Sequence, residues 1–511
     1  MYSYPMTAGA PLATNLSKVL SPSVDQDMKA RGVAQVIAVL APSAGASLVV
    51  ADSGAAAHRV ESCFRSSERS QASAVRQALV SRTGAAAAAA VLPPAQASVT
   101  FPNLGVVLGT VDLEGLAELQ ASADVSAICG TPQISLIRPE HVAAAAAPAG
   151  ITWGIEHLGV PALWKQGLTG KNVMVAHLDT GVDATHPTLK KAVSAFAEFE
   201  LSLGQRMTPD PAPHDSGDHG THTAGTIAGR PLAGRHIGVA HGALLHSGLV
   251  IEGGNLVARV LGGLDWAIGN QVKIINMSLG FRGWWEDFIP IMQIIRSHGI
   301  LPVIAVGNEG PGTSRSPGNY PTVLSVGAED DRSTVARFSS SQTFARPDDP
   351  LVPDLVAPGV DVISAAPNKA YQSMSGSSMA TPHVAGLAAL LWEAKPTATA
   401  ADIEKAICDS CRLAGALTPD RANRGEPDAR NAFARLTGIT LPPVATSVAV
   451  SAAPSTAAAA RKAPRAGGKK AAKRGAPRRS TKAATRKKTG TTAKTGSAKK
   501  AAKTTGARKK R

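Results

Sequence analysis

The sequence predicts an α/β protein with a parallel sheet that is covered by helices on both faces. Its strand-like segments are apolar throughout, as strands buried on both faces are; they span residues 173–179, 272–280, 301–308 and 322–328. Helical patterns lie between them, such as LVARVLGGLDWAIGN and EDFIPIMQIIRSHG. Because strands and helices alternate, a parallel sheet with crossover helices fits best, and we expect this domain to cover residues 151–437. Functional groups in such sheets gather at the carboxyl ends of the strands.

The residues before this domain predict a smaller α+β domain. Residues 1–32 are mixed in character and indicate a loose arm. From Val33, VAQVIAVLAP predicts a strand, SVTFPNLGVVLGTV a strand pair, LEGLAELQASADVSAI a helix, and QISLIRPEHV a last strand. We therefore expect a domain over 33–141, with Ala85–Ala90 as a low-complexity insertion. Residues 142–150 are small and predict a cleavable linker.

Charge is divided unevenly along the 511 residues, whose formal net charge is +16. Residues 461–511 hold 21 Lys or Arg and no acidic residue, which leaves 32 basic against 37 acidic residues elsewhere. The body is therefore mildly acidic. Residues 438–460 are rich in Pro, Ala, Val and Ser and predict a linker. The tail that follows cannot build a core, and we expect it to be disordered.

The tail resembles the Lys/Ala/Pro-rich tails of linker histones and their bacterial counterparts. No Phe, Tyr or Trp occurs from residue 441 onward, so the tail cannot stack on bases. Contact with DNA or RNA would be directed at phosphates, sensitive to salt and blind to sequence. Another polyanion, an anionic surface, or no specific partner are the alternatives.

The remaining composition excludes several classes of protein. Four cysteines in a chain of this length do not indicate a disulfide scaffold. For the C-x-x-C of Cys408 and Cys411, chance spacing is favoured over a local disulfide or a metal site. The first 30 residues show no secretory signal, and no run of about 18 apolar residues predicts a membrane span. The cytoplasm is therefore favoured over secretion by another route.

A candidate nucleophile lies in Ser373–Gly386, SMSGSSMATPHVAG, which is followed by the apolar run LAALLW. A small-residue turn leads into a helix, and Pro382 is expected in the first turn, where its missing N–H leaves no helical bond unmade. The helix is apolar on nearly every face and should be buried. A serine at its start has its hydroxyl at the positive end of the helix dipole, near unpaired N–H groups.

Three other segments offer the groups that a serine nucleophile needs, namely a base, a group that orients the base, and an oxyanion donor. HLDTGVD places Asp179 at a strand end, and DHGTHTAG places His219 at the start of a small-residue helix. VGNEG places Asn308 in a glycine-flanked turn. Taken singly, Asp179 could cap a turn, His219 could be a core histidine, and Ser378 could be a helix cap. Their combination favours catalysis.

The motifs DTGVD, HGTHTAG, NMSLG, AVGNEG, APGV and GSSMATPHVAG resemble those of subtilisin-like serine proteases (the subtilase or S8 family), in the family's order. The resemblance implies a serine endopeptidase that hydrolyses peptide bonds through an acyl-enzyme. It implies Ser378 as nucleophile, His219 as base and Asp179 as the group that orients the base. It also implies Asn308, with the Ser378 backbone N–H, as oxyanion donor. His222 would pack behind His219.

The resemblance also implies how substrates bind. Two segments would hold the substrate backbone as an added strand, and their alternative is a plain loop; they are Ser278, Leu279 and Gly280, and Glu252, Gly253 and Gly254. Arg315 aligns with a position that can line the pocket for P1, the residue before the scissile bond. It would favour an acidic P1 residue or point to solvent. Cleavage in the alanine run at 143–147 would require a small P1 residue instead.

The N-terminal domain resembles the subtilisin propeptide by its position, size and ending. The resemblance implies self-processing of a precursor whose propeptide inhibits by leaving its last strand in the active site. Thr188 and His241 replace an aspartate and a proline that are usual around the family's calcium site. We therefore expect no required metal and no cofactor. The rival hypotheses are a nucleic-acid-associated protein that uses the protease fold as a platform, and an inactive peptide-binding module.

Overall fold

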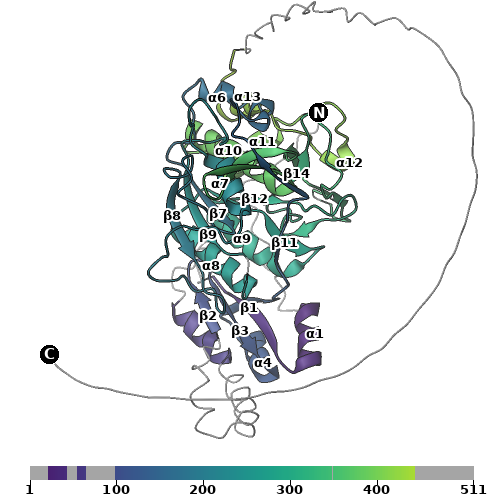
Figure 1. Ribbon diagram of the computed structural model, residues 1–511. Helices are drawn as coiled ribbons and strands as arrows, with labels where there is room; N and C mark the ends of the chain where they lie inside the picture. The colour runs from purple at the N-terminus through teal and green to yellow at the C-terminus, as the bar shows by residue number, and fades with distance from the viewer. Residues whose placement is uncertain (1–20, 43–53, 65–97, 252, 348, 443–511) are drawn as a thin grey trace, which may run out of the picture. The chain divides into compact units, whose positions relative to one another are not determined.

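The computed structural model describes residues 21–42, 54–64, 98–251, 253–347 and 349–442 (Figure 1). All of these belong to one compact unit. The predictions that concern Ala85–Ala90, Glu252 and the basic tail lie outside the described residues.

Seven parallel strands form the central sheet, in the order β17-β14-β12-β10-β7-β9-β8 (Figure 1). Every residue of the four strands from β10 to β17 in this order is buried, which explains why such segments are apolar throughout. The prediction of a parallel sheet is confirmed. Its strands are β7 (Met174–Asp179), β8 (Val193–Glu198), β9 (Leu244–Leu249), β10 (Ile274–Met277), β12 (Leu301–Ala305), β14 (Leu324–Glu329) and β17 (Leu355–Pro358).

Helices cover both faces of this sheet. Neighbouring strand residues join different hydrophobic clusters: Ile274 packs with one set of helices, and Ile275 packs with the other. The first set consists of α5 (Trp153–His157), α6 (Pro161–Trp164), α7 (His219–Ala228), α10 (Ser377–Ala394), α11 (Ala400–Cys408) and α13 (Ala429–Thr437). The second consists of α8 (Leu256–Gly269) and α9 (Ile289–Ser297), preceded by the 3₁₀ turn η1 (Glu286–Phe288). The short helix α12 (Pro419–Ala422) lies near the end of the described chain.

The N-terminal residues form a four-stranded antiparallel sheet of order β2-β3-β1-β4. In β1, Val36 packs on the helices of this domain, whereas Ile37 packs in the cluster that holds α8 and α9. Asp265 of α8 accepts a bond from the Leu104 N–H at 2.9 Å. The strands are β1 (Ala34–Leu40), β2 (Ser98–Phe101), β3 (Val106–Val111) and β4 (Val125–Gly130); the helices are α1 (Pro22–Arg31), residues 54–64 and α4 (Leu113–Ala121).

Two predictions for this region were wrong. Pro22–Arg31, expected within a loose arm, is a helix with Ser21 as N-cap and left-handed Gly32 as C-cap. The helix expected over LEGLAELQASADVSAI ends at Ala121, and Val125–Gly130 instead pairs with β1. Both elements depend on packing against β1, which the local pattern does not reveal.

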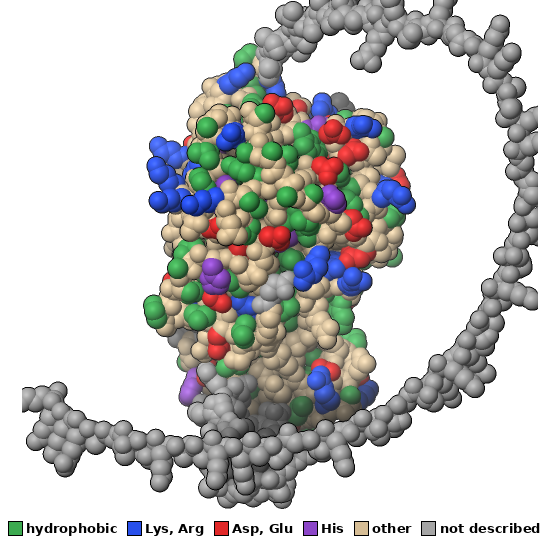
Figure 2. Space-filling view, viewed as in Figure 1, with side chains coloured by type: hydrophobic (Ala, Val, Ile, Leu, Met, Phe, Trp, Pro, Cys, Tyr) green, Lys and Arg blue, Asp and Glu red, His purple; other side chains and the backbone are tan. Residues whose placement is uncertain are grey.

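The surface of the described residues carries charges of both signs, and both dot the face drawn in Figure 2. Among the helices of the described residues, none is long and apolar enough to cross a membrane.

Gly225→Ala is expected to destabilise the protein by about 1–3 kcal/mol. In an open helix the same change would stabilise by about 1 kcal/mol. Here a Cβ atom would lie 2.4 Å from Ser364 Oγ and 3.1 Å from the Ala365 nitrogen, where α7 packs against β18 (Val362–Ala366). Urea unfolding in a Ser378→Ala background measures the effect.

Gly150→Ala is the matched control, because its Cβ would meet no atom within 4 Å. It should change stability by less than about 0.5 kcal/mol. Equal stability of the two variants would contradict the close packing of α7.

Candidate functional site

Asp179 and His219 lie together at the carboxyl edge of the central sheet. Asp179 ends β7, and His219 begins α7. His219 Nδ1 and Asp179 Oδ1 are 2.7 Å apart, and the Thr180 N–H donates to the same oxygen at 2.7 Å. Both side chains are buried. His219 Nε2 has no hydrogen-bond partner among the described residues.

The two groups stabilise each other's charge. Burial raises the pKa of Asp179, but the charge and hydrogen bond of His219 outweigh it, and the net pKa lies below its usual value. Burial lowers the pKa of His219, but Asp179 outweighs it in the same way, and the net pKa is raised. An imidazole in this environment accepts a proton at Nε2 more readily than a free one, as a general base requires.

His222 has a different environment. Its Nε2 donates to the Val362 carbonyl at 2.9 Å, and the side chain is fully buried. Burial lowers the pKa of His222 to about 3. It therefore stays neutral at physiological pH and has the surroundings of a core histidine.

Ser378 is the second residue of α10, a helix that is buried from Ser377 to Trp392. Because the helix begins at Ser377, Pro382 is its sixth residue and does not lie in the first turn as predicted. Pro382 has no N–H, so the Ser378 carbonyl lacks its helical partner. Ser278 Oγ donates to this carbonyl at 3.3 Å. A side chain that follows β10 thus replaces the missing helical bond.

Asn308 is held in one orientation by the residue before Ser378. Its Oδ1 accepts from the Ser377 N–H at 2.9 Å and from Ser377 Oγ at 2.8 Å. The amide nitrogen therefore faces the other way, and it donates to the Arg138 carbonyl at 2.9 Å.

The chain itself crosses this site as an extended segment, residues 135–145. On one side, β5 (Ser135–Leu136) pairs antiparallel with β11 (Leu279–Arg282), and the Ile137 N–H donates to the Ser278 carbonyl at 3.0 Å. On the other side, β6 (His141–Ala145) pairs antiparallel with β19 (Ala370–Ser375). The first residues of the expected linker, 142–145, thus belong to a strand.

Two successive carbonyls of the segment contact the polar groups of the site. Ser378 Oγ donates to the Ile137 carbonyl at 2.7 Å, whereas Asn308 donates to the Arg138 carbonyl. Because the Ser378 hydroxyl has one proton, it cannot donate to His219 at the same time. The peptide bond that follows Arg138 is made to the nitrogen of Pro139.

Arg315 is neither solvent-facing nor free to attract an acidic residue, the two alternatives that we expected. It is buried in β13 (Arg315–Ser316), and its Nε donates to Glu309 Oε1 at 2.9 Å. Its Nη1 donates to Ser135 Oγ at 2.8 Å. Burial raises the pKa of Glu309, but Arg315 outweighs it and lowers the net pKa. Sequence reasoning missed Glu309, although it stands next to Asn308 in VGNEG.

The second predicted substrate segment has a loop conformation where the structure describes it. Gly253 and Gly254 have φ values of 85° and 70°, which favour glycine. The Gly253 carbonyl accepts from Arg259, and a Cβ at Gly254 would meet the Leu201 backbone. Strand pairing at the site instead involves β11 and β19. The sequence signal for β19 is the alternating AYQSMS just before the serine.

Cys408 and Cys411, like the other two cysteines, are free thiols. Burial raises the pKa of both. A half-buried thiol with a raised pKa is a poor nucleophile and a poor metal ligand.

The fold and the site together define a hydrolase of the serine type. The sequence profile of the Subtilase family matches residues 170–436. The chain is 37% identical over 300 residues to M-protease of Shouchella clausii (strain KSM-K16), which covers 58% of this chain and 71% of the relative. It is 31% identical over 310 residues to Subtilisin E of Bacillus subtilis (strain 168), with 59% and 74% covered. The chain belongs to the subtilase family and is a serine endopeptidase.

The replacement His383→Asn is expected to reduce the loss of stability between pH 7 and pH 5 by about 2 kcal/mol. His383 is fully buried on α10, and burial lowers its pKa to about 4. Below a pH of about 6.5 the unfolded chain binds a proton there that the folded chain does not. The free energy of unfolding therefore decreases as the pH is lowered from 7 to 5. Asparagine, which does not titrate, removes that part of the loss.

Urea unfolding at the two pH values measures the difference, in a Ser378→Ala background. His58→Asn is the control, since the His58 side chain is 74% exposed. An equal loss in both variants would show that His383 does not stay neutral.

Proposed function

We propose that this chain is the precursor of an endopeptidase that uses Asp179, His219 and Ser378 as a catalytic triad. Ser378 Oγ attacks the substrate carbonyl while His219 Nε2 takes its proton, which gives a tetrahedral intermediate. His219 then protonates the leaving amine, and an acyl-enzyme remains. Water hydrolyses the acyl-enzyme by the same two proton transfers in reverse. Asp179 stabilises the imidazolium throughout.

The observation that carries this proposal is the contact of Ser378 Oγ with a backbone carbonyl of an extended peptide, at 2.7 Å. The site already holds a peptide, and its serine already lies against that peptide's backbone. The hydrogen bond between His219 and Asp179 and the outward amide of Asn308 support the other roles. Loss of one such oxyanion donor costs subtilisin about 10²–10³ in kcat.

Substrates bind, in this proposal, as an added strand on both sides of the scissile bond. Ser278, Leu279 and Gly280 hold the residues before it, and β19 holds the residues after it. The pairing of β5 and β6 supports both surfaces. Arg315 and Glu309 line the first surface as a neutral pair, which removes the reason to expect an acidic P1 residue. Gly253 and Gly254 remain candidates for a flanking contact with the substrate.

Residues 33–141 act, in this proposal, as a propeptide that inhibits the precursor until the chain cuts itself. Three observations support inhibition. Segment 135–145 fills the site, the Ser378 hydroxyl is engaged by Ile137, and Asn308 holds the next carbonyl instead of the same one. For an attack, Ser378 Oγ must approach the carbon of the same carbonyl group whose oxygen accepts a hydrogen bond from Asn308. The segment is therefore held in a resting arrangement, and it must shift by about one residue before it can be cut.

The wild-type chain is expected to convert itself to a shorter form, whereas Ser378→Ala stays at full length. Sequencing of the new N-terminus should place the cut between residues 137 and 150. After removal of the N-terminal domain, a fluorophosphonate should label Ser378.

Ser377→Ala is the matched control for this experiment. It keeps the Ser378 hydroxyl but loses a bond to Asn308, so it should process more slowly without stopping. The same cut in Ser378→Ala, or no labelling of the processed enzyme, would contradict the proposal.

The tail over residues 461–511 binds nucleic acid or another polyanion in this proposal. Its 21 basic residues without an acidic one support such binding. Removal of residues 443–511, which keeps every described residue, should abolish binding to random-sequence DNA at low salt. In the full chain, the affinity should fall steeply with added salt. Unchanged binding after truncation would refute this role for the tail. It would favour the alternative in which the protease fold itself is a nucleic-acid-associated platform.

A further inference from the structure

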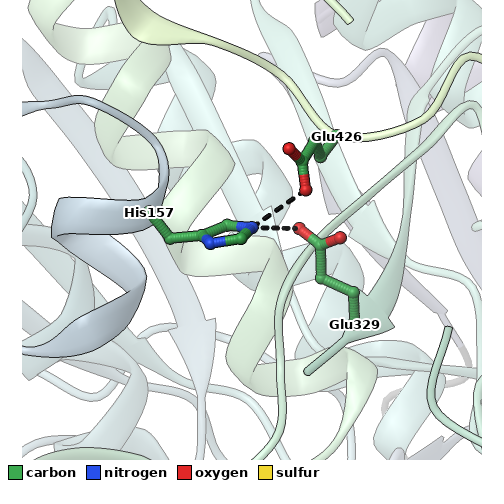
Figure 3. A group of neighbouring side chains, drawn as sticks. All are labelled: His157, Glu329 and Glu426. Atoms are coloured by element: carbon green, nitrogen blue, oxygen red, sulfur yellow. Dashed lines mark hydrogen bonds and ion pairs between the residues drawn. The ribbon is translucent and has the colours of Figure 1, made fainter. Parts of the chain in front are cut away.

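A cluster of titratable side chains that catalysis does not use joins three separate elements (Figure 3). His157 ends α5, Glu329 ends β14, and Glu426 precedes α13. His157 Nε2 lies 2.9 Å from Glu426 Oε2 and 3.7 Å from Glu329 Oε1. One donor atom from each residue lies within 4.8 Å of the other two.

Glu329 is the unsatisfied member of this cluster. It is fully buried, and neither carboxylate oxygen has a hydrogen-bond partner among the described residues. Figure 3 shows its carboxylate directed at His157, which at 3.7 Å lies beyond hydrogen-bonding distance. Burial and the nearby Glu426 raise the pKa of Glu329 well above its usual value. A buried carboxylate without a partner is costly, so its place calls for a ligand.

Glu426 is by contrast held firmly. Ser333 Oγ donates to its Oε2 at 2.7 Å, and Arg412 Nε donates to its Oε1 at 3.0 Å. Burial raises the pKa of Glu426, but the bonds from His157 and Ser333 outweigh it and lower the net pKa to about 2. Arg412 therefore balances one of the two carboxylates. Glu329 has no such hydrogen bonds among the described residues. Bonds of the kind that hold Glu426 orient a metal ligand.

We propose that His157, Glu329 and Glu426 bind one divalent cation of the Zn²⁺ type. One imidazole nitrogen and two carboxylate oxygens suit such a cation, whereas Ca²⁺ prefers six to eight oxygens. Bonds of about 2.0–2.2 Å to a tetrahedral ion put its ligand atoms about 3.4 Å apart. The two separations from His157 Nε2, 2.9 and 3.7 Å, bracket that value. The His157 side chain is 18% exposed, so water can supply a fourth ligand.

The cation would tie the start of the enzyme body to the region around the serine. Glu329 and the N-cap of α10 are connected by two successive backbone bonds, from Gly359 N–H to the Glu329 carbonyl and from Gly376 N–H to the Gly359 carbonyl. On α5, Trp153 Nε1 donates to the Val360 carbonyl. The site therefore bridges α5 and the backbone leading to Ser378 without touching a substrate.

The test uses the full chain with Ser378→Ala, stripped of metal by a chelator and titrated with ZnCl₂ in a calorimeter. We expect one equivalent to bind, and a rise in Tm of about 3 °C at a hundredfold excess over Kd. Glu329→Gln should weaken binding at least about 100-fold. It should still fold, because glutamine keeps the shape and removes the buried charge. CaCl₂ should not compete at equal concentration.

Asp331→Asn is the matched control, since the Asp331 side chain is 70% exposed in the same loop. It should bind zinc like the parent. If the Glu329→Gln variant still binds one equivalent of zinc like the parent, the zinc site lies elsewhere and the proposal is overturned. No saturable binding, or equal binding of calcium, would also overturn it. A more stable Glu329→Gln together with a parent that ignores zinc would mean that Glu329 carries a proton instead.

Discussion

The hydrogen bond between Asp179 and His219 is the contact on which the rest of the structure depends. Asp179 lies fully buried at the end of a central strand. A carboxylate that is shielded from water needs an opposite charge and hydrogen-bond donors beside it. Only an element that comes close to β7 can bring it a partner. Helix α7 does so because its second residue is glycine: a Cβ at Gly220 would lie 2.1 Å from the Gly181 carbonyl oxygen. The close packing of α7 at Gly220 is therefore what allows His219 to pair with the buried charge of Asp179.

Sequence reasoning predicted the fold of the larger domain, and it singled out the residues that we propose as its catalytic site. Continuously apolar segments identified the strands because both faces of the sheet are covered. Asp179, His219, Asn308 and Ser378 stood out because each lies in a short motif of turn and helix-start residues. They come from separate segments, and only the fold brings Asp179 to His219 and Asn308 to the start of α10.

The predictions that failed share a physical cause, which is contact between residues far apart in the chain. Pro382 looked like a first-turn proline, since the sequence does not reveal that Ser278 supplies the missing bond. Arg315 looked like a free charge, since the sequence reveals neither that its own loop turns Glu309 back onto it nor that the distant Ser135 contacts it. The cluster around Glu329 had no motif at all, because its members lie in three unrelated segments. Local pattern predicts elements well and pairings between them poorly.

Segment 135–145 pairs with strands on both sides of Ser378, so a cut within it separates one half from the enzyme but not the other. While the chain is intact, both halves of the segment are present at a fixed effective concentration. A cut between them makes β5 part of a separate molecule, held by its own strand pairing and by the sheet that packs on α8. Dilution can remove that half. The other half, β6, remains joined to the enzyme by a short link, at an effective concentration on the order of 1 mM. A substrate must therefore displace β6 however dilute the enzyme becomes, and only further trimming of the new end abolishes that competition.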